Sequence, residues 1–212
     1  MEVGISFKLF LYVIIVFSAV FHEYFHAWTA NFLGDPTAKY AGRLTLNPLK
    51  HLDPVGTVIL PLFLLFFVGG FIGWAKPVPY NPYNLRDQKW GSTKVAIAGP
   101  GANFLLAVIF GLGVRFGAMF GIIGMGSILY IALTWIVYVN IFLGLFNLIP
   151  IPPLDGSKLL MDLFPQSRTI QFLEGSFVGI FLALILALMF IPHVAGFFYN
   201  LLIGLPFVGL GF

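Results

Sequence analysis

The sequence contains no cysteine, and only 9% of its 212 residues are charged. Without cysteine there are no disulfide bonds or thiolate metal sites, so any metal must be held by histidine and carboxylate side chains. Soluble domains usually carry about 25% charged residues, whereas this chain is 59% hydrophobic and contains 25 phenylalanines. Its net charge of +3 is too small and too scattered to indicate a nucleic-acid partner. We therefore predict an integral membrane protein that is surrounded by the lipid bilayer.

Long apolar stretches predict an all-α polytopic membrane protein, because a membrane-crossing helix needs about 20 mostly apolar residues. Candidate spans are residues 7–32, 95–116, 127–149 and the shorter 175–191, while 194–212 either crosses the membrane or lies in its interface. We expect about four to six transmembrane helices in one membrane domain over residues 1–212. Its core would cover about 7–165, and C-terminal helices about 170–212. The first stretch is too long for a signal peptide and lacks a cleavage site.

Two segments after the first span do not fit simple spans. Residues 55–71, VGTVILPLFLLFFVGGF, are interrupted by Pro61 and by the pair Gly69 and Gly70. Residues 73–84, GWAKPVPYNPYN, carry three prolines and cannot form a regular helix. Such backbone is tolerated at membrane depth only where protein or a water-lined cavity satisfies its polar groups. The Pro-rich segment is therefore either an interfacial loop with aromatic anchors or a re-entrant element that faces substrate.

Residues 19–28 read AVFHEYFHAW and place His22, Glu23 and His26 in the first predicted helix. Side chains four residues apart share a helix face, so both imidazoles can bind one metal ion. Glu23 lies beside that face, as suits a general base that acts on metal-bound water. One Zn²⁺ per chain is the predicted cofactor, because histidine and carboxylate ligands with an open position are its usual catalytic set. Short patterns recur by chance, but each ionisable group in a membrane helix costs about 2.5–3.5 kcal/mol, which favours a bound metal.

A catalytic zinc ion usually keeps three protein ligands, so one more acidic side chain is needed. The acids outside the motif are Glu2, Asp35, Asp53, Asp87, Asp155, Asp162 and Glu174. Asp35 and Asp87 lie among polar loop residues, where we expect a solvated position. Asp155 follows a predicted helix in NLIPIPPLDGSK, where Gly156 permits a tight turn. Asp53 is its rival, with N-capping of a helix as its other role, and spacing does not decide between Asp155 and Asp53.

These segments resemble the site-2 protease family of intramembrane zinc metalloproteases. The resemblance rests on HEYFH in the first helix and on FNLIPIPPLDGSKLL at 146–160. AGPGANFLLA at 98–107, GRLTLNPLKHLDPVGT and GWAKPVPYNP support it. Many members of the family carry a PDZ domain or a CBS pair, and this chain is expected to be a compact branch with neither.

The resemblance implies the roles of individual residues. His22, His26 and Asp155 would bind zinc, and Glu23 would be the general base. Asn147 would position the substrate or the developing oxyanion, although a helix–helix hydrogen bond is its alternative role. The implied activity is that of a zinc metalloendopeptidase in regulated intramembrane proteolysis, with peptide bonds within or near transmembrane segments of other proteins as its substrate.

Two other classes of protein compete with the protease. A metal or proton transporter would also carry intramembrane histidines and acids, but it would distribute them along several helices instead of at one depth. A catalytically inactive zinc-binding scaffold has no need of Glu23 and would prefer a closed fourth ligand. His51 and His193 are expected to have interfacial or hydrogen-bonded roles.

The positions of the two motifs also predict the topology. The histidines lie about two-thirds along the first helix and Asp155 follows the exit of the span 127–149, so both helices must run in the same direction to share one ion. Residues 34–94 then begin and end on one face of the membrane, and 55–71 must re-enter.

That face holds nine cationic residues: Lys39, Arg43, Lys50, Lys76, Arg86, Lys89, Lys94, Lys158 and Arg168. The other face holds only Lys8 and Arg115, whereas a full span at 55–71 would give seven against four. The positive-inside rule therefore places the active site near the cytosol and the N-terminus outside, in what we expect to be the plasma membrane.

Overall fold

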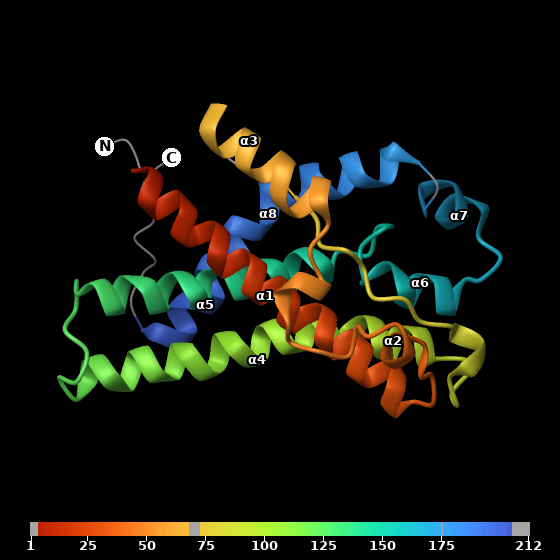
Figure 1. Ribbon diagram of the computed structural model, residues 1–212, viewed down its shortest axis with the longest axis horizontal. Helices are drawn as coiled ribbons and strands as arrows, with labels where there is room; N and C mark the ends of the chain where they lie inside the picture. The colour runs from red at the N-terminus through yellow and green to blue at the C-terminus, as the bar shows by residue number, and fades with distance from the viewer. Residues whose placement is uncertain (1–3, 68–72, 175, 205–212) are drawn as a thin grey trace. The chain divides into compact units, whose positions relative to one another are not determined.

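The computed structural model describes residues 4–67, 73–174 and 176–204 (Figure 1). These residues form helices joined by turns, and none of them belongs to a β-strand, which confirms the predicted all-α class. Within these described ranges, four helices are long and apolar enough to cross a membrane: α1 (Ile5–Phe32), α4 (Gly91–Met119), α5 (Ile128–Asn147) and α8 (Phe177–Ile203). The chain is therefore an integral membrane protein at the lower end of the expected range of spans.

The chain divides into two compact units, residues 1–91 and 92–212, and each is described by itself. The single domain expected from the sequence stays a prediction. In the first unit α1 is followed by the short helix α2 (Thr37–Tyr40) and the 3-10 turn η1 (Pro48–Lys50). A π-helical segment, η2 (Pro54–Ile59), then leads into α3 (Leu60–Phe67), and the 3-10 turn η3 (Pro82–Asn84) comes last.

The apolar segment after η1 forms a hairpin. Its helical part, Pro54–Phe67, is shorter than the about 20 residues that a membrane span needs. On the return, the N–H of Trp74 donates to the carbonyl of Gly56 and the N–H of Lys76 donates to that of His51, both at 3.0 Å. The outgoing and returning chains are thus hydrogen-bonded to each other at the base of the hairpin. This favours the re-entrant arrangement over a full span.

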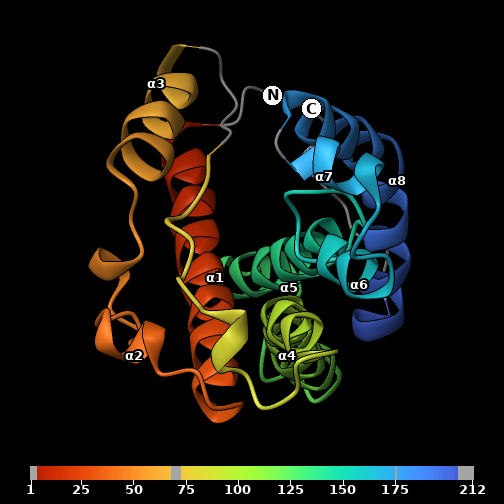
Figure 2. The ribbon, with the colours of Figure 1, turned by 90° about the vertical axis from the view of Figure 1, so that its right-hand side faces the viewer.

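Residues 73–81, called the strap below, leave the hairpin without regular secondary structure. The strap runs beside α1 (Figure 2). Near its start, the hydroxyl of Thr57 in η2 donates to the carbonyl of Trp74 at 2.7 Å. The prolines prevent a helix here, as predicted, and protein groups meet the polar backbone, as irregular chain at membrane depth requires. The reversal expected at Gly69 and Gly70 lies outside the described residues.

In the second unit, α4 and α5 are joined by a turn over residues 120–127 and pack through buried asparagines. Asn103 donates from Nδ2 to Oδ1 of Asn140 at 2.9 Å, and Asn140 donates to the carbonyl of Ile136 at the same distance. Two short helices, α6 (Ser157–Leu163) and α7 (Arg168–Glu174), lead from α5 to α8.

One row of α8 residues at every fourth position is buried, and its part from Ala187 to Ile203 packs in one core cluster with Val137 and Ile141 of α5. The row comprises Gly179, Ala183, Ala187, Ile191, Ala195, Tyr199 and Ile203, all buried. Small residues in such a row let membrane helices approach closely, and the exposed remainder of α8 is apolar enough to face lipid. The predicted end of this helix at Pro192 is wrong, because α8 continues through Pro192 to Ile203. A proline removes one backbone donor, and membrane helices tolerate this interruption; residues 205–212 lie outside the described part of the chain.

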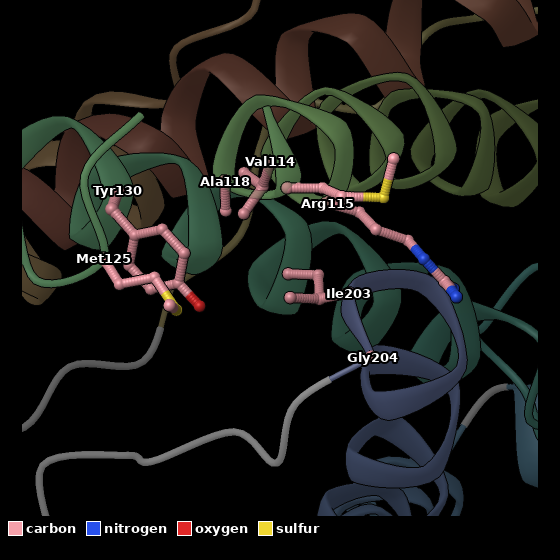
Figure 3. Close-up of a pocket in the computed structure, with 8 residues that line it drawn as sticks. Val114, Arg115, Ala118, Met125, Tyr130, Ile203 and Gly204 are labelled. Carbon is pink, nitrogen blue, oxygen red and sulfur yellow. The ribbon is translucent and has the colours of Figure 1, made fainter. Parts of the chain in front are cut away.

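A cavity of about 290 Å³ opens where α4, α8 and the turn after α4 meet (Figure 3). Its lining is apolar except for Arg115 and Tyr130. Arg115 donates from Nη1 to the carbonyl of Leu201 at 3.1 Å. Its positive charge therefore stabilises the negative C-terminal end of the α8 helix dipole. The cavity lies at least about 35 Å along α4 from the start of that helix, where α6 is attached through Thr93 and Asp162.

Candidate active site

The two histidines of the HExxH motif lie one turn apart on α1, and both are buried. Their Nε2 atoms are 2.9 Å apart, and the rings meet edge to face with centroids separated by 4.5 Å. Two ligands of a tetrahedral zinc ion, each at about 2.05 Å, would lie about 3.3 Å apart. If the two Nε2 atoms move apart by a few tenths of an ångström, both can bind one zinc ion. His22 and His26 therefore fit the predicted cofactor.

Glu23 lies beside the histidine face, as the motif predicts, and its carboxylate contacts the strap. Oε2 of Glu23 accepts a hydrogen bond from the N–H of Val78 at 2.8 Å. The side chain is only half-buried. The candidate base is therefore held by a backbone donor that follows it by 55 positions in the sequence.

Asp35 is not in the solvated position expected for it, because its side chain is fully buried. It accepts hydrogen bonds from the hydroxyl and N–H of Thr37, from the N–H of Asn81 at 2.7 Å and from Nδ2 of Asn84 at 2.9 Å. Burial raises the pKa of Asp35, but these hydrogen bonds outweigh it, so the pKa lies below its ordinary value. The polar loop residues near Asp35, from which we expected a solvated position, instead donate hydrogen bonds to its carboxylate.

Four more acids outside the motif also have structural partners. Asp53 caps η2, with Oδ1 accepting from the N–H groups of Val55 and Gly56 at 3.0 and 2.6 Å, which is the alternative role the sequence predicts for it. Asp87 is half-buried and accepts from two N–H groups ahead of α4. Asp162 accepts from the N–H and hydroxyl of Thr93 in the first turn of α4. Glu174 forms an ion pair with Lys158 at 3.0 Å.

Asn147 and Asp155 belong to the second unit and bracket one tight turn. Helix α5 ends at Asn147, whose carbonyl accepts from the N–H of Gly156 at 2.7 Å. Nδ2 of Asn147 donates to the carbonyl of Leu143 at 3.0 Å, within its own helix and not across helices. A Cβ atom on Gly156 would lie 2.2 Å from the carbonyl oxygen of Leu148, so only glycine fits there. The half-buried Asp155 is thus carried by a turn whose shape glycine determines.

The other two histidines have hydrogen-bonded roles. His51 is buried, and its Nε2 lies 2.7 Å from the carbonyl oxygen of Thr45. His193 is exposed on α8, with Nδ1 3.2 Å from the carbonyl oxygen of Met189. Both contacts are of the hydrogen-bonded kind that the sequence predicts for these two side chains.

Sequence reasoning missed two partners in the contacts that the strap makes. One is the N–H of Val78, because the flanking Pro77 and Pro79 predict extended chain but not which part of α1 it passes. The other is Arg43, which is buried and donates from Nη2 to carbonyls of the strap. An arginine among polar loop residues carries no local signal of burial, so the sequence predicts no more than a charge on the membrane face.

A membrane-length helix with this arrangement of two histidines and a glutamate is characteristic of membrane metalloproteases. The chain belongs to Peptidase family M50, whose profile matches residues 10–123 and 116–192. This confirms the resemblance to the site-2 proteases.

Relatives with names of their own agree with the family. "Putative zinc metalloprotease YwhC" of Bacillus subtilis is 38% identical over 190 residues, which cover 86% of this chain and 81% of the relative. "Putative zinc metalloprotease Rip2" of Mycolicibacterium smegmatis is 33% identical over 141 residues, or 66% of this chain and 51% of the relative. The Rip2 of Mycobacterium tuberculosis H37Rv is 29% identical over 185 residues, covering 86% and 67% of the two chains. The zinc in these names is the ion that the sequence predicts, and no solved structure matches the chain significantly.

Proposed function

We propose that this protein is an intramembrane zinc metalloprotease that hydrolyses peptide bonds within or near transmembrane segments of other membrane proteins. The observation that carries the proposal is the histidine pair of α1, with Nε2 atoms 2.9 Å apart in a helix of membrane length. Buried imidazoles of this kind are stabilised by a metal ion and not by hydrocarbon.

His22 and His26 are the first two proposed zinc ligands, and Asp155 is the third. Support for Asp155 comes from the N-cap made by Asp53, which engages the carboxylate of the rival. The family resemblance of the segment 146–160 supports the same choice. When bound, zinc supplies a water whose pKa is lowered toward about 7 and polarises the peptide carbonyl.

The chain's own residues then handle protons and charge. Glu23 takes the proton of the attacking water and delivers it to the leaving amine. The amide of Asn147 has two N–H groups, and one of them is held by the carbonyl of Leu143. Its second N–H can donate to the oxyanion that develops on the substrate carbonyl.

We also infer the setting of the reaction. The hydrogen-bonded base of the hairpin supports the arrangement in which residues 34–94 begin and end on one face. The excess of Lys and Arg on that face makes it cytosolic, with the N-terminus outside and the plasma membrane as the location. The substrate is a transmembrane segment, which must unwind locally because helical amides are shielded by their own hydrogen bonds.

The test pairs zinc content with cleavage of a membrane-embedded reporter by the purified protein. Glu23→Gln should keep one zinc per chain and lose cleavage by at least about 100-fold, since it removes the proton acceptor. Asp155→Ala should lose zinc and cleavage together. Asp53→Asn keeps a good helix cap and should retain both. A wild-type chain without zinc, or zinc flux into liposomes without cleavage, would refute the protease.

A further inference from the structure

One peptide unit of the strap contacts both a cation and the candidate base. The carbonyl of Pro77 accepts from Nη2 of Arg43 at 3.4 Å, and the same nitrogen donates more closely to the carbonyl of Lys76. The N–H of Val78 donates to Oε2 of Glu23 at 2.8 Å. In a trans peptide the C=O and N–H bonds point to opposite edges of one plane. Arg43 and Glu23 therefore flank the Pro77–Val78 peptide.

The position of Arg43 is energetically expensive, which indicates a specific role. Its side chain is 6% exposed, and among the described residues its hydrogen-bond partners are the two strap carbonyls, with none for Nε. A buried cation without a carboxylate is destabilising unless its hydrogen bonds are needed where they are made. The bonds it does make fix consecutive carbonyls immediately before the N–H that contacts Glu23.

The strap is also fastened on both sides of Val78. Before it, the N–H of Lys76 donates to the carbonyl of His51 at 3.0 Å. After it, the N–H of Asn81 donates to the buried Asp35 at 2.7 Å. The N–H of Val78 is therefore a fixed donor and not the tip of a loose loop.

We propose that Arg43 is a positioning residue for Glu23 and acts through the Pro77–Val78 peptide. This inference rests on the proposed function, because it concerns the orientation of the general base. A glutamate on a helix surface has several rotamers and two equivalent oxygens. Holding Oε2 leaves Oε1 pointing in one direction, as proton transfer requires. The guanidinium also polarises the peptide and strengthens the donor on its far edge.

Val78→Pro is the direct test, because it removes the N–H and keeps the extended chain between two prolines. Val78→Ala is the matched control, since it shortens the side chain and keeps the donor. We expect kcat of Val78→Pro to fall about 10- to 100-fold relative to Val78→Ala, the range for one hydrogen bond to a charged group. KM and zinc content should not change. Equal kcat for the two variants, or a higher kcat for Val78→Pro, would overturn the inference.

Arg43 is tested by coupling. Arg43→Gln should lower kcat in the same way as Val78→Pro. Combining the two changes should cause little further loss, because both break the same chain of contacts from Arg43 through the Pro77–Val78 peptide to Glu23. Arg43→Lys keeps a cationic donor and should recover part of the activity. Arg86→Gln replaces an exposed arginine of the same unit and should leave kcat unchanged. Independent, multiplicative losses for Arg43→Gln and Val78→Pro would contradict this chain of contacts.

A readout without catalysis separates this inference from the proposed function. The sequence contains three glutamates, so the infrared carboxylate band of Glu23 is isolated by labelling glutamate with ¹³C and subtracting the spectrum of Glu23→Gln. We expect that band to shift in Val78→Pro and Arg43→Gln but not in Val78→Ala. If wild type cleaves nothing and the band shifts, the proposed function fails while the contact stands. An unshifted band in Val78→Pro refutes the inference whatever the activity.

Discussion

Asp35 is the residue that joins the end of α1 to the far end of the strap. Its carboxylate receives donors from the turn after α1 and from residues 81 and 84, all without exposure to solvent. Because the donors favour the charged form, the pKa of Asp35 lies below its ordinary value. This carboxylate therefore stabilises the fold mainly while it is ionised.

Asp35→Asn should lower the stability of the fold at neutral pH. The loss should be about 1.5–3 kcal/mol, since hydrogen bonds to a charged acceptor are replaced and an amide N–H group faces other donors. Thermal unfolding in detergent at pH 7 measures it. Asp87→Asn, which can still cap the start of α4, is the control and should have a smaller effect.

The same contacts set a pH dependence. The contribution of Asp35 is complete above about pH 4, the ordinary value of the group, and is lost as the pH falls through the lower pKa of the folded state. The stability difference between wild type and Asp35→Asn should therefore shrink as the pH falls below about 4. A difference that stays constant over that range would show that the charge of Asp35 is not what stabilises the fold.

At the scale of elements, the turn between α5 and α6 determines where Asp155 is presented. The three prolines of this turn end α5, and Gly156 lies against the carbonyl of Leu148. A side chain at position 156 has no room unless the backbone beside Asp155 moves.

Gly156→Ala should therefore reduce zinc binding without touching a ligand. The Cβ atom would lie 2.2 Å from a backbone oxygen, so the turn must shift and carry the carboxylate with it. We expect less than one zinc per chain by elemental analysis and a matching loss of cleavage. Gly196→Ala on α8 meets no atom within 4 Å and should keep full zinc. Full zinc and activity in Gly156→Ala would show that Asp155 tolerates the shift or is not a ligand.

The elements also show what local sequence can predict. The four membrane helices follow from runs of apolar residues, and the shared face of His22 and His26 follows from their spacing. The continuation of α8 through Pro192 does not follow, because it depends on the apolar surroundings of the whole helix. The contacts of Asp35 and Arg43 with the strap join residues more than 30 positions apart, and no local pattern encodes such pairs.

At the scale of the whole molecule, the hairpin decides the topology. If it re-enters, residues 50 and 89 lie on the same face of the membrane, and residue 122 in the turn after α4 lies on the other. A full span would instead separate residues 50 and 89.

Single cysteines test this directly, because the natural chain has none. Lys50→Cys and Lys89→Cys should react with a membrane-impermeant maleimide in inside-out vesicles. Ile122→Cys, which is exposed, should react in intact right-side-out cells. Labelling of residues 50 and 89 from opposite sides would exclude the re-entrant hairpin.

The strap has a consequence for the survival of the protein itself. A protease that keeps part of its own backbone beside its proposed general base is exposed to self-digestion. Here Glu23 meets an amide hydrogen, while the carbonyl of the same peptide is turned toward Arg43. The bonds that enter Pro77 and Pro79 are tertiary amides with no N–H. The strap can therefore lie beside the proposed catalytic carboxylate as a peptide that is bound without being cut.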